Sequence, residues 1–380
     1  MAGSAENAPT WRSSFPAMGT RVDIIGWGGD GMAIVNAVVG IVARHEDMWS
    51  VFRPSSEVSR LNAAVRDAAI GDGASRCGAD SAHGGPGLVV SEETDRLLRD
   101  ALALAEATGG TFNPLIGPLV AAWDVKAMRA AYVAGAPLPP APAADAVEAA
   151  SRASSWGLLS RVGEQRWAMG VPCESVGGVD VASPRLDLGG IAKGYTADAC
   201  RDLAVSMGAR GVLVSVGTSS VSVFGTRADG SSWRAGLRDP HGGPTSVAGV
   251  VELPAGGMSS LSTSGDNLGP LGRVGVGCAA ERAAESTSDR RARETPRETS
   301  VGGGRVFDHH IIDPRTGYPA HAGVRQVSVV ASSGVLAEAL STALLVEPSI
   351  DVPDVVARWA RVTGAPASAK VVGLVRAAQG

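Results

Sequence analysis

The spacing of hydrophobic residues along the chain predicts a mixture of strands and helices. Apolar and polar residues alternate over Thr20–Gly26, which predicts a half-buried strand, whereas the helical spacing of apolar residues over Met32–Asp47 predicts a helix. Further strands are predicted at Val212–Val216, Val221–Gly225, Trp233–Leu237, Gln326–Ala331 and Val371–Val375. Further helices are predicted between a Ser91 N-cap and Gly109–Gly110, over Ile191–Ser206, after a Ser333 N-cap over Gly334–Leu345, and over Val355–Val362. These elements alternate irregularly and without an internal repeat, which predicts an α+β fold.

Segments without either pattern are predicted to be loops. We expect disorder over residues 1–14, a mobile surface loop over 63–88 and a Pro/Ala connector over 134–144. Trp49–Asn62, which contains Pro and Ser, is predicted as a loop leading into a short turn. In the polar stretch 278–304, acidic residues and arginines alternate with small residues, which predicts a solvated loop.

The composition narrows the class of protein. The 380 residues are 44% hydrophobic and 19% charged, as in soluble globular proteins, and the net charge of −4 argues against binding to nucleic acid or to an anionic membrane. No run of about 18 apolar residues could cross a membrane, and the N-terminus lacks the basic and apolar regions of an export signal. The scattered Cys77, Cys173, Cys200 and Cys278 are read as free thiols of a reducing compartment. We therefore predict a cytoplasmic protein.

The segment Leu186–Asp198, with the sequence LDLGGIAKGYTAD, is suited to holding phosphate. Gly189 and Gly190 precede a predicted helix, and glycine lets the backbone approach an anion at a helix N-terminus. Lys193 lies in the first turn, where its ammonium group could reach the same anion. An ordinary strand-to-helix turn with a surface lysine explains the same residues.

The segment Ala337–Thr342, with the sequence AEALST, is suited to holding a hard cation. Glu338, Ser341 and Thr342 are spaced i, i+3 and i+4, so they share one helix face. Carboxylate and hydroxyl oxygens are ligands that Mg²⁺ or Ca²⁺ accepts. The alternative is an amphipathic helix whose polar face is turned to solvent.

A third candidate segment, Phe307–Pro319, contains adjacent histidines between two turns. Asp-Pro and Thr-Gly mark the turns, and His309 and His310 precede them. A histidine near a phosphate can donate a hydrogen bond or act as a general base. A strand-end histidine that only stabilises a turn is equally consistent with this pattern.

These segments and four others resemble, in order, the motifs of the ApbE family of FAD:protein FMN transferases. The matching blocks are AMGT (Ala17–Thr20), SVFRPSSEVSRLN (Ser50–Asn62), GGTFNPLIGPLVAAW (Gly109–Trp123), LDLGGIAKGYTADA, STSGD (Ser262–Asp266), HIIDPRTG (His310–Gly317) and AEALSTAL (Ala337–Leu344). The resemblance implies an ApbE-type, T-fold-like architecture with a central, mainly antiparallel sheet and flanking helices. It implies one flavin transferase domain over residues 15–346, on which a helix and strand from 347–380 pack.

The resemblance also implies a reaction and its participants. FAD is the substrate, Mg²⁺ polarises its pyrophosphate, and a threonine or serine hydroxyl of an acceptor protein attacks the FMN phosphorus so that AMP leaves. The positions that contact FAD in the family correspond here to Met18, Phe52, Thr111, Phe112, Asn113, Asp187, Lys193, His310 and Ile312. The magnesium positions correspond to Gly190, Glu338, Ser341 and Thr342, and the catalytic positions to His310 and Lys193.

The chain departs from the family pattern at several of these positions. Glu338 replaces the usual Asp, and one added methylene moves a carboxylate by about 1 Å, which matters because Mg²⁺ requires near-octahedral geometry. Asn113 stands where Asp is usual, Phe52 where Tyr is common, and Gly217-Thr218-Ser219 replaces a Gly-Gly-Asp/Asn turn. The stretch 278–304 is an insertion. These departures indicate a divergent member.

Three functions remain open on the sequence alone. The first is FMN transfer to a cytoplasmic acceptor protein. The second keeps FAD and the fold but uses water or a small molecule as the acceptor. The third is FAD binding without turnover, which the altered residue Glu338 suggests.

Overall fold

The main feature of the fold is a large antiparallel sheet. The computed structural model describes residues 9–71, 87–134, 136–172, 182–242, 246–253, 258–265, 299–301, 304–306 and 310–376. Within these residues the sheet has seven strands in the order β1-β2-β6-β7-β10-β13-β14, and all neighbours are antiparallel. The strands are β1 Thr10–Ala17, β2 Thr20–Trp27, β6 Gly211–Val216, β7 Ser220–Gly225, β10 Met258–Gly265, β13 Val324–Ala331 and β14 Ala369–Arg376. The predicted α+β class with a mainly antiparallel central sheet is confirmed.

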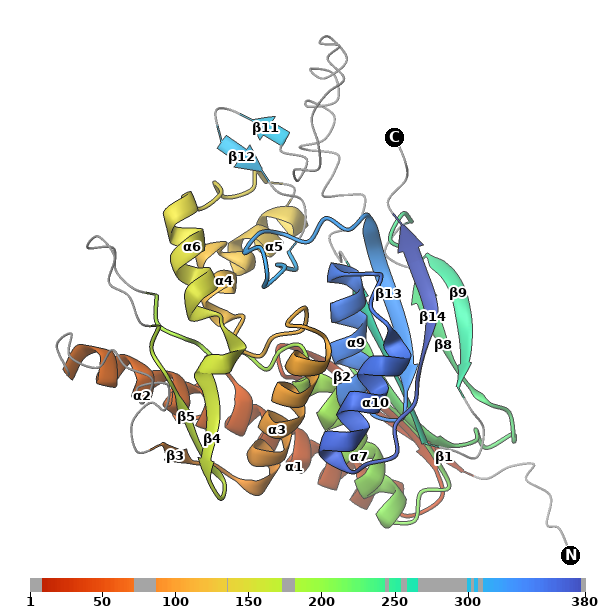
Figure 1. Ribbon diagram of the computed structural model, residues 1–380. Coiled ribbons are helices and arrows are strands. Elements are labelled where there is room, and N and C mark those ends of the chain that lie inside the picture. Colours follow the sequence, from red (N-terminus) through yellow and green to blue (C-terminus); the bar gives the residue numbers. More distant parts are fainter. Residues whose placement is uncertain are drawn as a thin grey trace, which may run out of the picture.

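Helices cover one face of this sheet and a two-stranded ribbon covers the other (Figure 1). The helices beside the sheet are α1 Gly31–Trp49, α7 Ala192–Ser206, α9 Gly334–Val346 and α10 Val352–Thr363, and the ribbon pairs β8 Trp233–Arg238 with β9 Val247–Leu253. Successive side chains of a strand point to opposite faces of the sheet, so the buried residues form a separate core cluster on each face. Val212 and Val214 of β6 are fully buried in the cluster with α1 and α7, whereas Val223 of β7 packs with Trp233 and Leu253 of the ribbon.

A second group of elements lies beside the helical face (Figure 1). Its helices are α2 Glu57–Gly71, α3 Glu92–Ala107, α4 Gly117–Ala122, α5 Val125–Ala134, α6 Ala144–Ala153 and the 3₁₀ turn Trp156–Leu158. A small sheet has the order β3-β5-β4, with β3 Leu88–Val89, β4 Leu159–Gly163 and β5 Arg166–Met169, and β11 Thr299–Val301 pairs with β12 Gly304–Val306. Leu97 and Leu104 of α3 belong to the same buried cluster as Leu336 of α9, so this group and the sheet share one core.

The helix and strand ends follow the predicted signals closely. Ser91 accepts a hydrogen bond from the Thr94 amide at 3.2 Å, and Ser333 accepts one from the Leu336 amide at 3.2 Å, as N-caps do. After α3, Gly109 has φ of +61° and therefore the left-handed conformation that ends many helices. The other predicted helices and strands are present with ends within three residues of the predicted ones.

Two loop predictions are wrong within the described residues. Residues 10–14 belong to β1, which has no fully buried side chain but pairs with β2 along its whole length. Residues 57–71, predicted as turn and mobile loop, form helix α2, whose buried Val58, Leu61 and Val65 lie at helical spacing. The rest of the 63–88 loop up to residue 86 lies outside the described residues, as do 266–298, which include most of the polar insertion.

Other predictions concern membranes and cysteines. None of the helices in the described ranges is both long and apolar enough to cross a membrane.

Cys200 is buried as a free thiol, and burial raises its pKa to about 12, which keeps it protonated and unreactive. The other three cysteines lie outside the described residues. The cytoplasmic location stays a prediction.

Candidate active site

The centre of the candidate site is Glu338, a carboxylate buried in the first half of α9. Its exposed fraction is 4%, and Ser341 on the same face is fully buried. The alternative of a helix with this polar face turned to solvent is therefore wrong. Such a carboxylate is stable in the core only with hydrogen-bond or charged partners.

Three groups from two other elements supply those partners. Glu338 Oε2 accepts a hydrogen bond from the Gly194 amide in the first turn of α7 at 2.8 Å. Oε1 accepts a short hydrogen bond from the Ser220 hydroxyl at the start of β7 and lies 3.5 Å from Lys193 Nζ. The two segments singled out in the sequence, although about 140 residues apart, are thus brought into direct contact.

Lys193 lies between this carboxylate and the glycines before α7. Its Nζ also donates to the Gly189 carbonyl oxygen at 2.7 Å, and its side chain is 27% exposed. Gly189 and Gly190 are exposed at the helix N-terminus, where amide groups and the helix dipole favour an anion. The ammonium group can therefore face solvent or a ligand while it remains paired with Glu338.

The glycine turn is held in place from both sides. Asp187 Oδ1 accepts from the Gly189 amide at 2.8 Å, and the Asp187 amide donates to the Pro114 carbonyl at 2.8 Å. Asn62 makes two hydrogen bonds with the Leu186 backbone, at 2.7 and 3.1 Å. A Cβ at Gly190 would lie 3.4 Å from the Phe112 ring, so this predicted site residue lies beside the turn.

Two neighbours of Phe112 use their polar groups within the fold. The buried Thr111 hydroxyl donates to the Thr108 carbonyl at 2.9 Å. Asn113 donates from Nδ2 to the Ser154 carbonyl at 2.6 Å and accepts at Oδ1 from the Leu115 amide at 2.8 Å. An aspartate at position 113 could not donate to the Ser154 carbonyl, because its side chain has no N–H group. The change to Asn113 therefore has a structural reason.

Ser341 and Thr342 belong to a cluster of hydroxyl groups on the sheet side of α9. Ser264 of β10 lies 2.8 Å from the Ser341 hydroxyl and 3.0 Å from that of Thr342. The Ser341 hydroxyl also lies 3.1 Å from the Glu338 carbonyl oxygen and 3.2 Å from the Ser262 hydroxyl, and its single proton can be donated to one of them at a time. Two of the predicted magnesium positions on α9, Ser341 and Thr342, are therefore hydrogen-bonded to β10.

Met18 and Phe52 have features that packing alone does not require. Met18 and Gly19 form the two-residue turn between β1 and β2, with φ of +52° and +67°. A non-glycine residue at positive φ costs about 1–3 kcal/mol, which makes Met18 a candidate for function. Phe52 is 78% exposed, and Lys126 Nζ lies 5.8 Å from its ring centre.

The histidine segment is placed only in part. His309 lies outside the described residues, whereas His310 is half-buried. It precedes a turn over residues 313–317, in which the Gly317 amide donates to the Asp313 carbonyl at 2.9 Å. Ile312 is buried in the apolar cluster of α4 and α6. Its side chain thus serves packing, and a cofactor contact would have to come from its backbone.

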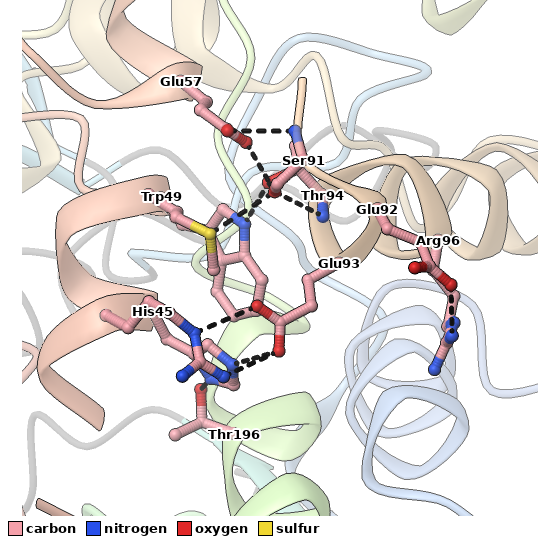
Figure 2. A network of polar contacts seen from close by, with 11 residues as sticks. His45, Trp49, Glu57, Ser91, Glu92, Glu93, Thr94, Arg96 and Thr196 are labelled. Carbon is pink, nitrogen blue, oxygen red and sulfur yellow. Dashed lines mark hydrogen bonds and ion pairs between the residues drawn. The ribbon is translucent and has the colours of Figure 1, made fainter. Parts of the chain in front are cut away.

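A buried polar network supports α7 one turn beyond Lys193 (Figure 2). Thr196 donates to the Ala192 carbonyl at 2.8 Å, so its hydroxyl must accept from His45 Nδ1, 2.9 Å away. His45 Nε2 faces Glu93 Oε1 at 3.5 Å, and Figure 2 shows Trp49 donating to Thr94 beside them. Thr196 lies in the glycine-lysine segment, but the sequence did not indicate the network, because its other members come from α1 and α3.

The His45 network predicts a pH-dependent stability. Burial lowers the pKa of His45 from 6.5 to about 4, although Glu93 opposes the change. The unfolded chain therefore takes up the proton first, and the free energy of unfolding falls by up to about 3 kcal/mol as pH drops from about 6.5 to 4. We expect this slope in urea titrations of the wild type and a smaller one for His45→Gln.

Wild type has to be compared with His45→Gln because Asp100 changes the free energy of unfolding with pH in the opposite direction to His45. Burial raises the pKa of Asp100 from 3.8 to about 6, so over that range its folded state binds the proton and stability falls as pH rises. This contribution is the same in both proteins and cancels in their difference. Equal pH slopes for wild type and His45→Gln would contradict the prediction.

Comparison with known proteins identifies the family. A sequence model described as the ApbE family matches residues 18–275 and 286–363. The chain belongs to the ApbE family. The matched ranges contain all the predicted site residues, from Met18 to Thr342.

Individual ApbE-family relatives agree with this membership. The chain is 31% identical over 322 residues to a FAD:protein FMN transferase of Treponema pallidum, covering 83% of this chain and 71% of the relative. It is 24% identical over 354 residues to a FAD:protein FMN transferase of Vibrio cholerae, covering 91% of this chain and 84% of the relative. The solved flavin transferase ApbE of Vibrio cholerae superimposes with a TM-score of 0.63, covers 98% of both chains and is 21% identical in sequence. The ApbE protein of Thermotoga maritima superimposes with a TM-score of 0.65, covers 97% of both chains and is 24% identical. These structures share the fold.

The sequence missed several residues of this site. Ser220, which lies between two predicted strands, received no role, and Ser262 and Ser264 were only part of a matching block. Asp198, at the end of the glycine-lysine segment, received no role. A usable signal was present for Asp198, because it follows Gly194 by four residues, as Glu338 follows Gly334.

Proposed function

We propose that this chain is a Mg²⁺-dependent FAD:protein FMN transferase that modifies a threonine or serine hydroxyl of an acceptor protein and releases AMP. The observation that carries the proposal is the contact of Lys193 with both Glu338 and the Gly189 carbonyl at an exposed helix N-terminus. The curated relatives named FAD:protein FMN transferase support the transfer of FMN from FAD to a protein. Phosphoryl transfer requires positioning and charge neutralisation more than covalent chemistry, and this arrangement supplies both.

In the proposed reaction, the acceptor hydroxyl oxygen forms a bond to the FMN phosphorus. The bond from that phosphorus to the bridging oxygen breaks, and the oxygen leaves with AMP. Lys193 and the turn at Gly189 and Gly190 hold the pyrophosphate, and His310 takes the hydroxyl proton. Met18, Phe52, Thr111, Phe112, Asn113, Asp187 and Ile312 are proposed to bind FAD.

The residues at the proposed magnesium positions fit this ion chemically. The Gly190 carbonyl, the Glu338 carboxylate and the hydroxyls of Ser341 and Thr342 are hard oxygen donors. Among the described residues no group of three His, Cys, Asp or Glu side chains could hold a metal. One carboxylate with substrate phosphates is nevertheless a usual arrangement for Mg²⁺. When bound, the ion would neutralise charge on the pyrophosphate.

One observation favours a second function, FAD binding without turnover. Glu338 already accepts from Gly194 and Ser220 and pairs with Lys193, so part of its lone-pair capacity is used within the protein. In that case FAD binds, and its pyrophosphate stays intact.

The proposed function predicts a product that mass spectrometry can detect. We expect incubation with FAD, Mg²⁺ and candidate acceptor proteins to add the mass of FMN to one acceptor and to release one equivalent of AMP. Omitting the acceptor should suppress AMP release. AMP formed without an acceptor would instead indicate hydrolysis, and bound FAD without AMP would indicate a silent binding protein.

A further inference from the structure

Helices α7 and α9 meet backbone to backbone at two glycines. A Cβ on Gly194 would lie 2.3 Å from the Gly334 carbonyl oxygen, and a Cβ on Gly334 would lie 2.3 Å from the Gly194 carbonyl oxygen. Real Cβ atoms do not approach backbone atoms this closely, so the crossing exists only with glycine on both helices. The crossing lies next to Lys193 and one turn from Glu338, the two charged residues of the candidate site.

Two carboxylates cross this contact in opposite directions. Glu338 of α9 accepts from the Gly194 amide of α7 at 2.8 Å, and Asp198 of α7 accepts from the Gly334 amide of α9 at 2.6 Å. Each acid follows the glycine of its own helix by four residues and therefore lies on the same face one turn later. Both amides lie in a first helical turn, where N–H groups lack an acceptor within the helix.

The second oxygens of the two carboxylates differ in their surroundings. Asp198 Oδ1 accepts from Arg201 at 2.9 Å, from Ser222 at 2.7 Å and from Ser260 at 2.6 Å. These partners are buried and join α7 to β7 and β10. Glu338 Oε1 accepts from Ser220 of β7 and also faces Lys193, which is partly exposed. Both carboxylates thus join the crossing to the sheet, but only Glu338 also faces the site.

We propose that Asp198 is a positioning residue that, together with Glu338, clamps the α7–α9 crossing and thereby sets the position of Lys193 relative to Glu338. This inference rests on the proposed function for its catalytic consequence, but the clamp itself can be tested without it. Asp198 does not touch the candidate ligand-binding groups, so it acts through the helix that carries Lys193.

The chemistry of the partners explains why a carboxylate is needed at position 198. Four donors converge on its two oxygens. They are Arg201 of the same helix, the hydroxyls of Ser222 and Ser260, and the Gly334 amide. An asparagine of the same shape has one acceptor oxygen and one NH₂ group, so it would turn a donor toward either Gly334 or Arg201. Asp198→Asn therefore opens one side of the clamp with little change in volume.

The test compares Asp198→Asn with Asp202→Asn. Asp202 also pairs with Arg201, at 2.8 Å, but its side chain is 54% exposed and makes no bond across the crossing, which makes it a matched control. The first readout is hydrogen exchange of the Gly194 amide, whose acceptor is Glu338 and not Asp198. We expect exchange to rise about tenfold in Asp198→Asn and to change less than about twofold in Asp202→Asn.

The second readout is the steady-state rate of FMN transfer. We expect kcat to fall about tenfold in Asp198→Asn while the KM for FAD stays within about threefold, because the misplaced groups act on the reacting phosphate. Unchanged exchange at Gly194, or an unchanged kcat in a transfer-competent protein, would overturn the proposal. If the wild type transfers no FMN, the proposed function fails, and the exchange experiment still decides whether the clamp exists.

A milder variant covers the case in which Asp198→Asn does not fold. Ser260→Ala removes one hydroxyl donor to Asp198 Oδ1 and leaves both amide bonds of the crossing. We expect the same direction of change in Gly194 exchange, by about threefold. Exchange equal to that of the wild type in this variant would contradict the clamp.

Discussion

Replacing Glu338 with glutamine is expected to lower the rate of FMN transfer by about 10²- to 10³-fold, the loss typical of removing one preorganised electrostatic group from an active site. Glutamine keeps the length of the side chain and can still accept from the Gly194 amide. It removes the negative charge that lies 3.5 Å from Lys193 and that is proposed to hold Mg²⁺. The measurement is kcat for AMP release and acceptor flavinylation at saturating FAD.

The control for this prediction is Glu338→Asp, which keeps the charge and shortens the side chain. We expect it to retain more activity than Glu338→Gln, because charge neutralisation at the pyrophosphate depends on the carboxylate. FAD affinity, followed by flavin fluorescence, should change less than kcat in both variants. If Glu338→Gln transfers FMN at the wild-type rate, Glu338 has no catalytic role; activity gained only in Glu338→Asp would favour the silent binding protein.

The second large effect is expected from Gly194→Ala, which should lower the free energy of unfolding by about 3 kcal/mol. The added methyl group would lie 2.3 Å from the Gly334 carbonyl oxygen, and backbone on both sides prevents an easy rearrangement. The helices must therefore separate, which also lengthens the bonds between Glu338 and α7. Urea denaturation measures the loss of stability, and transfer assays should show a parallel loss of activity.

Gly40→Ala is the matched control, since Gly40 lies inside α1 and a Cβ there would meet nothing within 4 Å apart from the backbone of its own helix. We expect this variant to be more stable than the wild type by about 0.5–1 kcal/mol, because alanine is the better helix former. Opposite signs for the two substitutions would show that the cost at Gly194 arises from the crossing. A Gly194→Ala protein as stable as the wild type would contradict the described helix contact.

The local signals in the sequence were reliable where one segment contained all the information. Ser91 and Ser333 cap α3 and α9 as predicted, since a cap depends on residues that are close in the chain. The two strands β6 and β7 were predicted for the same reason. Strand β1 was missed because it buries no side chain fully: Trp11 and Phe15 pack only at the edge of a core cluster, and the strand pairs with β2 along its whole length.

The candidate site was predictable in its residue types and not in its contacts. The sequence indicated that a glycine-lysine turn and an acidic helix face would cooperate, and it predicted the family through the order of seven blocks. It could not show that Glu338 is buried, because the polar face of α9 reads equally well as a solvent-facing surface. It also could not show that Asn113 serves the Ser154 backbone, a contact across 41 residues.

The sequence by itself therefore determined the fold class and the ends of the main helices, and it predicted which residues would hold phosphate and a hard cation. Each of these depends on local conformational preference or on chemical identity, both of which are written into neighbouring residues. Only the tertiary structure decided that Gly194 and Gly334 meet and that Asp198 and Glu338 cross between their helices. A contact between distant segments depends on how both pack against the same sheet, and the pattern of either segment alone does not contain that information.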